Sequence, residues 1–142
     1  MKFSVRRVSV TRGPGGWQAK ELWLSKSLQP NFNDTVIHQG HAYGFVGPRL
    51  ACIDLRDGAT KWQGATYAGF SILLAEQGLL LILTEKGEVA LVEARPDKFS
   101  ELARIPAVTG KTWNHPALAG DVLLARNAQE MVAYQLAPEG AR

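Results

Sequence analysis

The stretch from Val36 to Trp62, VIHQGHAYGFVGPRLACIDLRDGATKW, decides the fold. It consists of short apolar runs separated by turn signals, with Gly40 after the first run and Asp57-Gly58 before the last. Alternating runs bounded by Gly and Asp are typical of antiparallel strands joined by hairpins, because Gly adopts the positive φ that tight turns need. The stretch therefore predicts one antiparallel sheet of four strands.

The same arrangement recurs further along the chain. Leu73 to Phe99 reads LLAEQGLLLILTEKGEVALVEARPDKF, and Ala117 to Ala137 reads ALAGDVLLARNAQEMVAYQLA. The turn glycines Gly40, Gly78 and Gly120 lie 38 and 42 residues apart. A period of about 40 residues with four short strands in each repeat is the spacing of β-propeller blades.

Phasing the repeat gives the architecture. Thirteen strands are expected: the outer two of one blade, two complete blades of four, and the inner three of a last blade. We place them near Phe3–Val10, Trp17–Ser25, Thr35–His38, Ala42–Val46, Leu50–Leu55, Thr60–Thr66, Ser71–Ala75, Leu79–Thr84, Glu88–Glu93, Phe99–Ile105, His115–Leu118, Val122–Arg126 and Met131–Leu136. The blade pieces span about 1–31, 32–67, 68–109 and 110–137, with a tail at 138–142.

The predicted fold class is therefore all-β, a partial β-propeller of about three antiparallel four-stranded blades. Even the smallest propeller ring needs about sixteen strands, so thirteen cannot close one. We expect either the carboxyl-terminal fragment of a longer propeller or a chain whose partner copies supply further blades. A helical turn between Pro96 and Leu102 is the one alternative to continuous strand structure.

Composition limits the classes of function. The chain has 142 residues, is 46% hydrophobic and has a formal charge of +3 without a strongly basic block. That content supports a folded core and gives no reason to expect a nucleic-acid partner. Cys52 is the only cysteine and lies in an apolar run, so we expect a buried thiol and no disulfide. Neither a secretory signal nor a transmembrane segment is evident.

The residues of the first repeat also resemble a known family. They are Gly40-His41-Ala42-Tyr43-Gly44, the run Leu50–Leu55 ending in Asp54-Leu55, the turn Asp57-Gly58, and Trp62. They are similar to the repeat of pyrroloquinoline-quinone-like (PQQ-like) propellers, with its G-x-V-Y-like strand, A-L-D-like strand, T-G-like turn and outer-strand Trp. The resemblance extends from about Trp17 to Ala137.

The resemblance carries further expectations. The positions assigned to the structural repeat are Trp23, Gly40, Tyr43, Asp54, Gly58, Trp62, Gly78 and Gly120. Trp23 and Trp62 should dock against the neighbouring blade, and Phe99 or Leu102 should take the comparable place in the next repeat. The family includes quinone-dependent alcohol and sugar dehydrogenases and the outer-membrane assembly lipoprotein of the Bam complex. Its members imply a location in the periplasm or cell envelope.

The loops where the innermost strands begin form the candidate site, because they surround the channel of a propeller. Polar residues recur there, and we assign a ligand or partner surface to Asn33, Asp34, Ser71, Asn114 and His115, with Asn31 beside them. Ordinary capping of turns by Asn, Asp and Ser is the alternative explanation.

No catalytic residue and no metal site is assigned. His38 and His41 have H-x-x-H spacing, but Gly40 lies between them and no third ligand is near in the sequence, so surface histidines flanking a hairpin are favoured. His115 has no evident partner for general base catalysis.

Three functions remain open. The favoured one is a non-catalytic scaffold or binding module that presents blade loops to a protein or ligand, with no cofactor and with self-association through open sheet edges as a further possibility. The second is a fragment of a PQQ-dependent alcohol or sugar dehydrogenase, in which PQQ and calcium would bind at a site completed by other blades. The third is a binder of polysaccharides or small ligands that uses Trp113 and Tyr67 as stacking platforms.

Overall fold

A computed structural model describes residues 4–136 of the chain, and within that range every regular element is a β-strand. The strands are β1 (Val5–Gly13), β2 (Gly16–Ser25), β3 (Val36–His38), β4 (His41–Val46), β5 (Arg49–Asp54), β6 (Thr60–Thr66), β7 (Phe70–Leu74), β8 (Leu79–Leu83), β9 (Glu88–Glu93), β10 (Glu101–Pro106), β11 (Ala117–Ala119), β12 (Val122–Arg126) and β13 (Met131–Gln135). None of residues 4–136 belongs to a helix long and apolar enough to cross a membrane. The tail expected at 138–142 and Phe3, the first residue of the first expected strand, lie outside the described residues.

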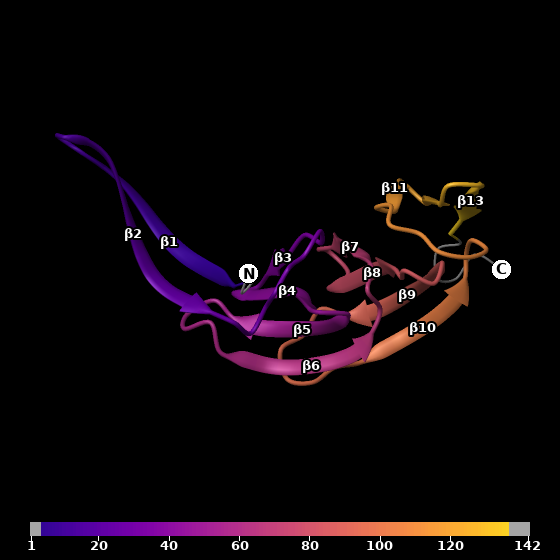
Figure 1. Ribbon diagram of the computed structural model, residues 1–142, viewed down its shortest axis with the longest axis horizontal. Helices are drawn as coiled ribbons and strands as arrows, with labels where there is room; N and C mark the ends of the chain where they lie inside the picture. Colours follow the sequence, from indigo (N-terminus) through magenta and orange to yellow (C-terminus); the bar gives the residue numbers. More distant parts are fainter. Residues whose placement is uncertain (1–3, 137–142) are drawn as a thin grey trace.

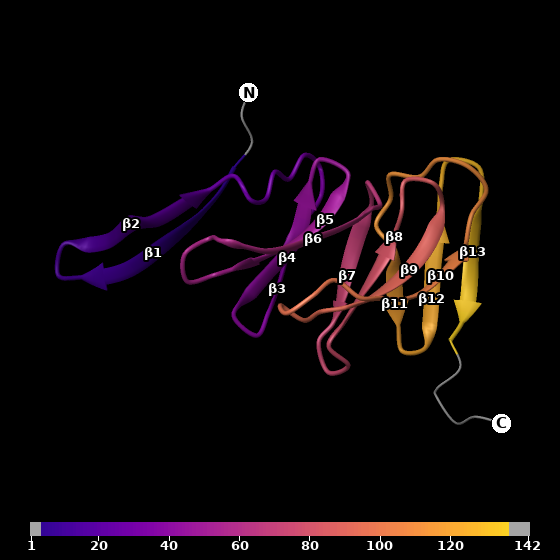
Figure 2. The ribbon, with the colours of Figure 1, turned by 90° about the horizontal axis from the view of Figure 1, so that it is seen from below.

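The strands form four separate antiparallel sheets, which we call blades 1 to 4. Blade 1 is the hairpin β1–β2, blade 2 is β3-β4-β5-β6, blade 3 is β7-β8-β9-β10, and blade 4 is β11-β12-β13. The blades follow one another in chain order along the molecule (Figure 2). The expected all-β class and the grouping of two, four, four and three strands are confirmed, and no sheet of the described part closes on itself.

The blades lie along an arc. The innermost strands β3, β7 and β11 lie on its concave side, and the outer strands β6 and β10 lie on its convex side (Figure 1). Blade 1 projects away from this body as a long hairpin. The loops that begin the innermost strands of blades 2, 3 and 4 are thereby brought near each other.

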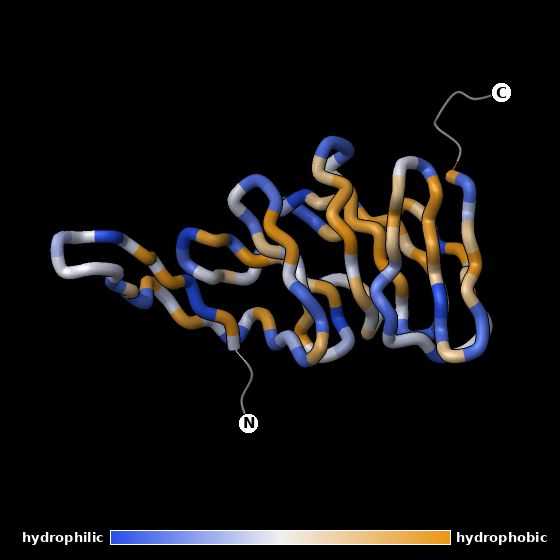
Figure 3. Tube along the Cα trace, turned by 90° about the horizontal axis from the view of Figure 1, so that it is seen from above, coloured by the Kyte–Doolittle hydropathy of each residue, from blue (hydrophilic) through white to orange (hydrophobic). Residues whose placement is uncertain are grey.

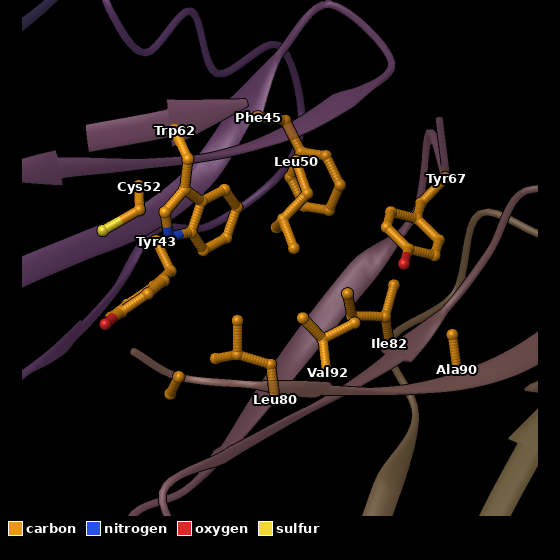
Figure 4. Packing of buried hydrophobic residues seen from close by; sticks show 11 residues of the cluster. Tyr43, Phe45, Leu50, Cys52, Trp62, Tyr67, Leu80, Ile82, Ala90 and Val92 are labelled. Atoms are coloured by element: carbon orange, nitrogen blue, oxygen red, sulfur yellow. The ribbon is translucent and has the colours of Figure 1, made fainter. Parts of the chain in front are cut away.

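The core consists of layers between successive blades, because each sheet alternates its side chains between two faces. Tyr43, Phe45 and Cys52 of blade 2 pack against Leu80 and Ile82 of blade 3, and Figure 4 shows this layer. A second layer joins blades 3 and 4, and a third joins blades 1 and 2. Apolar segments accordingly run through the middle of the strands of blades 2 and 3, with polar turns at their ends (Figure 3).

Two tryptophans of outer strands each form a hydrogen bond across a blade boundary. Trp23 Nε1 donates to the carbonyl oxygen of Leu55 at 3.0 Å, and Trp62 Nε1 donates to that of Arg95 at 2.8 Å. The Asp57-Gly58 turn fits this docking, because Gly58 has φ +74° and a Cβ there would lie 2.9 Å from the Trp23 ring. Glycine is required at this turn by both the backbone conformation and the space.

Blade 3 departs from the expected repeat at its outer strand. Trp62 lies opposite Cys52 of β5, whereas the corresponding pair in blade 3 is Ala103 opposite Leu91. The expectation of Phe99 or Leu102 at this place is therefore wrong. Phe99 turns back toward blade 2 and packs edge-on against Trp62 at 5.6 Å between ring centroids. No helical turn forms between Pro96 and Leu102; the chain bends there before β10.

Candidate binding site at the blade loops

A pocket of about 530 Å³ lies at the loop end of blades 2 to 4. Its walls come from the segments that precede β3, β7 and β11 and from the β4–β5 and β8–β9 turns. The lining residues are Asn31, Phe32, Asn33, Gly47, Pro48, Ala68, Phe70, Glu85 and Trp113. Because three blades contribute to it, the pocket exists only when the blades are stacked.

Aromatic residues dominate the walls, one from each blade. Phe32 precedes β3, Phe70 begins β7 and Trp113 precedes β11. Phe32 is 83% exposed and Trp113 is 68% exposed, whereas Phe70 is buried. Single exposed apolar side chains are common on a surface, but exposed aromatic side chains that gather around one pocket mark a surface that another molecule can cover.

A second cluster joins the three blades beside the pocket. Asp34, Phe70 and His115 each lie four residues before the end of their innermost strand, so they occupy equivalent positions. The ring of His115 lies 4.1 Å from that of Phe70, and His115 Nε2 lies 3.3 Å from Asp34 Oδ2. A side chain of blade 4 thus contacts blades 2 and 3 at once.

Trp113 is held in place by two charged residues. Its Nε1 donates to Glu85 Oε1 at 2.9 Å, and Lys111 Nζ lies 4.1 Å from the centre of its ring. Lys111 also pairs with Glu85 Oε1 at 2.7 Å. The hydrogen bonds from Lys111 and Trp113 lower the pKa of Glu85. The carboxylate therefore stays ionised at neutral pH and continues to accept the hydrogen bond from the indole.

The structure separates the residues expected at this surface. Asn33 lines the pocket, and its Nδ2 donates to the carbonyl oxygen of Gly69. Asp34 and His115 lie beside it, with His115 Nε2 3.3 Å from Asp34 Oδ2. Ser71 is buried and does not line the pocket, and Asn114 bonds Thr112 Oγ1 in a local turn. A ligand or partner surface at these residues stays a prediction.

Most of the apolar lining goes beyond the residues expected from the sequence. Phe32, Pro48 and Phe70 line the pocket, and the aromatic residues at 32, 70 and 113 recur at nearly the blade period. That recurrence is the signal in the sequence that indicates them. The expected surface is polar, whereas apolar side chains form most of the lining.

Other residues singled out earlier lie away from the pocket. His38 and His41 flank the turn at Gly40 as a cross-strand pair, and His41 Nδ1 lies 2.9 Å from the carbonyl oxygen of Gln39. Tyr67 is only 2% exposed and bonds Glu101, so it is no stacking platform. Residues 4–136 contain no group of three His, Cys, Asp or Glu side chains that could hold a metal ion.

The fold defines an incomplete β-propeller, built from stacked antiparallel blades around the concave side of an arc. Among solved structures, the chain is similar to BamB from Moraxella catarrhalis, with a TM-score of 0.65 and 17% sequence identity. The match covers 92% of this chain and 43% of that protein, so the chain spans less than half of the propeller it resembles. No family model and no curated protein matches the sequence.

Proposed function

We propose that this chain is a non-catalytic propeller module that binds a protein partner, and that the pocket at the blade loops receives one apolar side chain of an extended segment of that partner. The single observation that carries the proposal is the exposure of Phe32 and Trp113 over an aromatic pocket shared by three blades. Aromatic anchors in such pockets dominate the energetics of many protein interfaces. Similarity to BamB supports the coarse part of the proposal, a propeller scaffold.

The lining favours an apolar side chain over a sugar. Sugar hydroxyls need free hydrogen-bonding groups around an aromatic platform, but two of the polar side chains of the lining already have partners. The Asn33 amide donates to Gly69, and the Glu85 carboxylate accepts from Trp113 and Lys111. Beside the exposed Asn31, the wall consists mainly of the apolar surface of Phe32, Pro48 and Phe70.

We also propose the cell envelope as the place where the module acts. The support is the resemblance of the repeat to PQQ-like propellers, a family that includes the outer-membrane assembly lipoprotein of the Bam complex, and the fold shared with BamB. The PQQ-dependent dehydrogenase alternative stays a prediction.

The binding proposal is tested with a library of random linear peptides displayed on phage and selected against the immobilised 142-residue chain. We expect enriched peptides to share a large aromatic or aliphatic residue. Their affinity is then measured by fluorescence polarisation. Phe32→Ala and Trp113→Ala should each weaken binding by about 10-fold or more, since loss of an anchoring aromatic contact at an interface costs on the order of 2 kcal/mol.

Trp17→Ala is the matched control. Trp17 is 71% exposed, about as exposed as Trp113, but it lies next to the tip of the β1–β2 hairpin. This hairpin projects away from the blades that line the pocket (Figure 2). This variant should bind the selected peptides as the unmodified chain does. Peptides without a shared apolar residue, or binding that survives both pocket substitutions, would contradict the proposal.

A further inference from the structure

The last sheet leaves an apolar face uncovered. In blade 4, Leu123, Ala125, Val132 and Tyr134 point toward blade 3. The alternate residues point the other way, and no other sheet of residues 4–136 packs on them. The apolar ones are Ala117, Ala119, Val122, Leu124, Met131 and Ala133. Arg126 and Gln135 are the polar residues of the same face. We call this surface the forward face of blade 4.

The same face is an interface in the preceding blades. Tyr43 and Phe45 on the forward face of blade 2 are covered by blade 3, and Leu81 and Leu83 on that of blade 3 are covered by blade 4. A sheet face turned permanently to water normally alternates to polar residues, and this one carries no carboxylate and no lysine. The forward face of blade 4 is therefore composed like the interfaces before it.

The other end of the arc offers a complementary surface. Trp23 of β2 points at blade 2, so its neighbour Leu24 points away from it, on the face that also carries Arg6 opposite Leu24. Leu24 is 48% exposed, and Arg6 pairs with Glu21 at 3.1 Å. We call this surface the rear face of blade 1. In the stacking order of the arc, a forward face meets the rear face of the next blade.

Both end sheets also have open edges. Within residues 4–136, β13 pairs only with β12, and β1 pairs only with β2. Open edges and apolar faces at both ends make the arc capable of continuing in either direction, because unpaired strands readily pair with strands of other chains.

We propose that a second copy of this chain covers these surfaces, with the forward face of blade 4 in each copy packed on the rear face of blade 1 in the other. Two such junctions close a ring in which each copy contributes four sheets. The eight sheets of this ring fall within the range of about four to eight blades seen in propellers. The share of the BamB chain that one copy matches, 43%, is close to half a ring.

A head-to-tail ring makes a prediction that other modes of pairing do not. Leu24 and Leu124 of different copies meet at each junction, whereas two Leu124 residues never meet. We therefore test crosslinking between the separately purified variants Leu24→Cys and Leu124→Cys with a short bis-maleimide. Cys52 is fully buried and does not compete for the reagent.

The expected result is a crosslinked dimer when the two variants are mixed, and none when either is treated alone. Light scattering of the unmodified chain at tens of micromolar should give twice 15.5 kDa. Ile37→Cys mixed with Leu24→Cys is the control for random collision, since Ile37 is exposed but lies on the innermost strand of blade 2. Leu124→Arg should shift the chain toward the monomer while its circular dichroism spectrum stays that of the unmodified chain.

Three outcomes would overturn the proposal. A monomer of 15.5 kDa at tens of micromolar would leave the forward face uncovered or reserved for a different chain. Crosslinking of Leu124→Cys with itself would mean that two forward faces pack on each other. Assemblies larger than two copies would mean that the junction forms without closing a ring.

Discussion

The indole of Trp62 donates a hydrogen bond across a blade boundary to the carbonyl oxygen of Arg95, at 2.8 Å. One repeat earlier, the indole of Trp23 does the same to Leu55. In both cases a tryptophan of an outer strand bonds a backbone carbonyl just after the third strand of the next blade. Each bond thereby fixes the relative position of two sheets that share no backbone hydrogen-bond ladder.

Replacing Trp62 by Phe should therefore destabilise the chain by about 2 kcal/mol. Roughly half of that is the lost hydrogen bond, and the rest is the volume left by the smaller ring in a buried layer. Trp23→Phe should cost less, because Trp23 is only partly buried. The measurement is urea-induced unfolding followed by far-ultraviolet circular dichroism. Trp17→Phe should change the free energy of unfolding by less than about 0.5 kcal/mol, and an equal loss at all three positions would contradict the docking role.

Gly64 should not tolerate a methyl group. A Cβ at this position would lie 2.3 Å from Cδ2 of the Phe99 ring, which packs between blades 2 and 3. We expect Gly64→Ala to cost about 1–3 kcal/mol, the usual range for overpacking a core. In a Phe99→Ala background the same substitution should cost far less, because the ring is gone. Gly15→Ala, where a Cβ meets nothing within 4 Å, is the control, and additive losses in the double variant would refute the contact.

The arrangement of strands was predictable because each strand has a local sequence signal, an apolar run between turn residues. Apolar runs such as Leu79–Leu83 are flanked by turns that contain glycines of positive φ, here Gly78 and Gly87, and the repeat period assigns every run to a blade. The outer strand of blade 3 was not predictable in the same way. Its bulge between Glu101 and Ala103 shifts the register by one residue, and only the pairing itself shows that Ala103 takes the place opposite β9.

The pocket lies at loops where the sequence predicts polar residues: Asn33 lines it, and Asp34 and His115 lie beside it. A ligand or partner surface at these residues stays a prediction. Ser71 is one residue past the position equivalent to Asp34 and His115, so its side chain lies on the opposite face of β7 from Phe70, where it is buried and does not line the pocket. A one-residue offset inverts the face of a strand residue, and the sequence alone does not fix that offset.

Cys52 should be inert in the folded chain. The thiol is fully buried in the layer between blades 2 and 3, and burial raises its pKa to about 11, so thiolate is scarce at neutral pH. Ellman's reagent at pH 8 should release almost no colour from the native chain and one equivalent of thiol per chain after denaturation. Rapid reaction of the native chain would mean that this layer opens readily.

Asp54 should make the chain sensitive to acid. Its carboxylate accepts hydrogen bonds from the Arg56 side chain and backbone, which hold the pKa of Asp54 well below its ordinary value of about 3.9. The pair therefore stabilises the fold at every pH above the unfolded pKa, and this stabilisation is lost as the pH falls below about 4 toward the folded pKa.

The expected result is a urea midpoint that falls more steeply between pH 5 and pH 2 in the unmodified chain than in Asp54→Asn. Arg56→Gln should reduce the steepness as well, because it removes the partner that lowers the pKa of Asp54. Parallel curves for the unmodified chain and both variants would show that the pair does not contribute.

The proposed binding depends on a single pocket formed by residues of three blades. Hydrogen exchange followed by mass spectrometry tests this pocket directly, with the 142-residue chain alone and saturated with a peptide selected against it. We expect simultaneous protection of segments around 31–33, 47–48, 68–70 and 113, which are remote in sequence and meet at the pocket. Protection confined to the hairpin of residues 5–25, or to one blade alone, would contradict it.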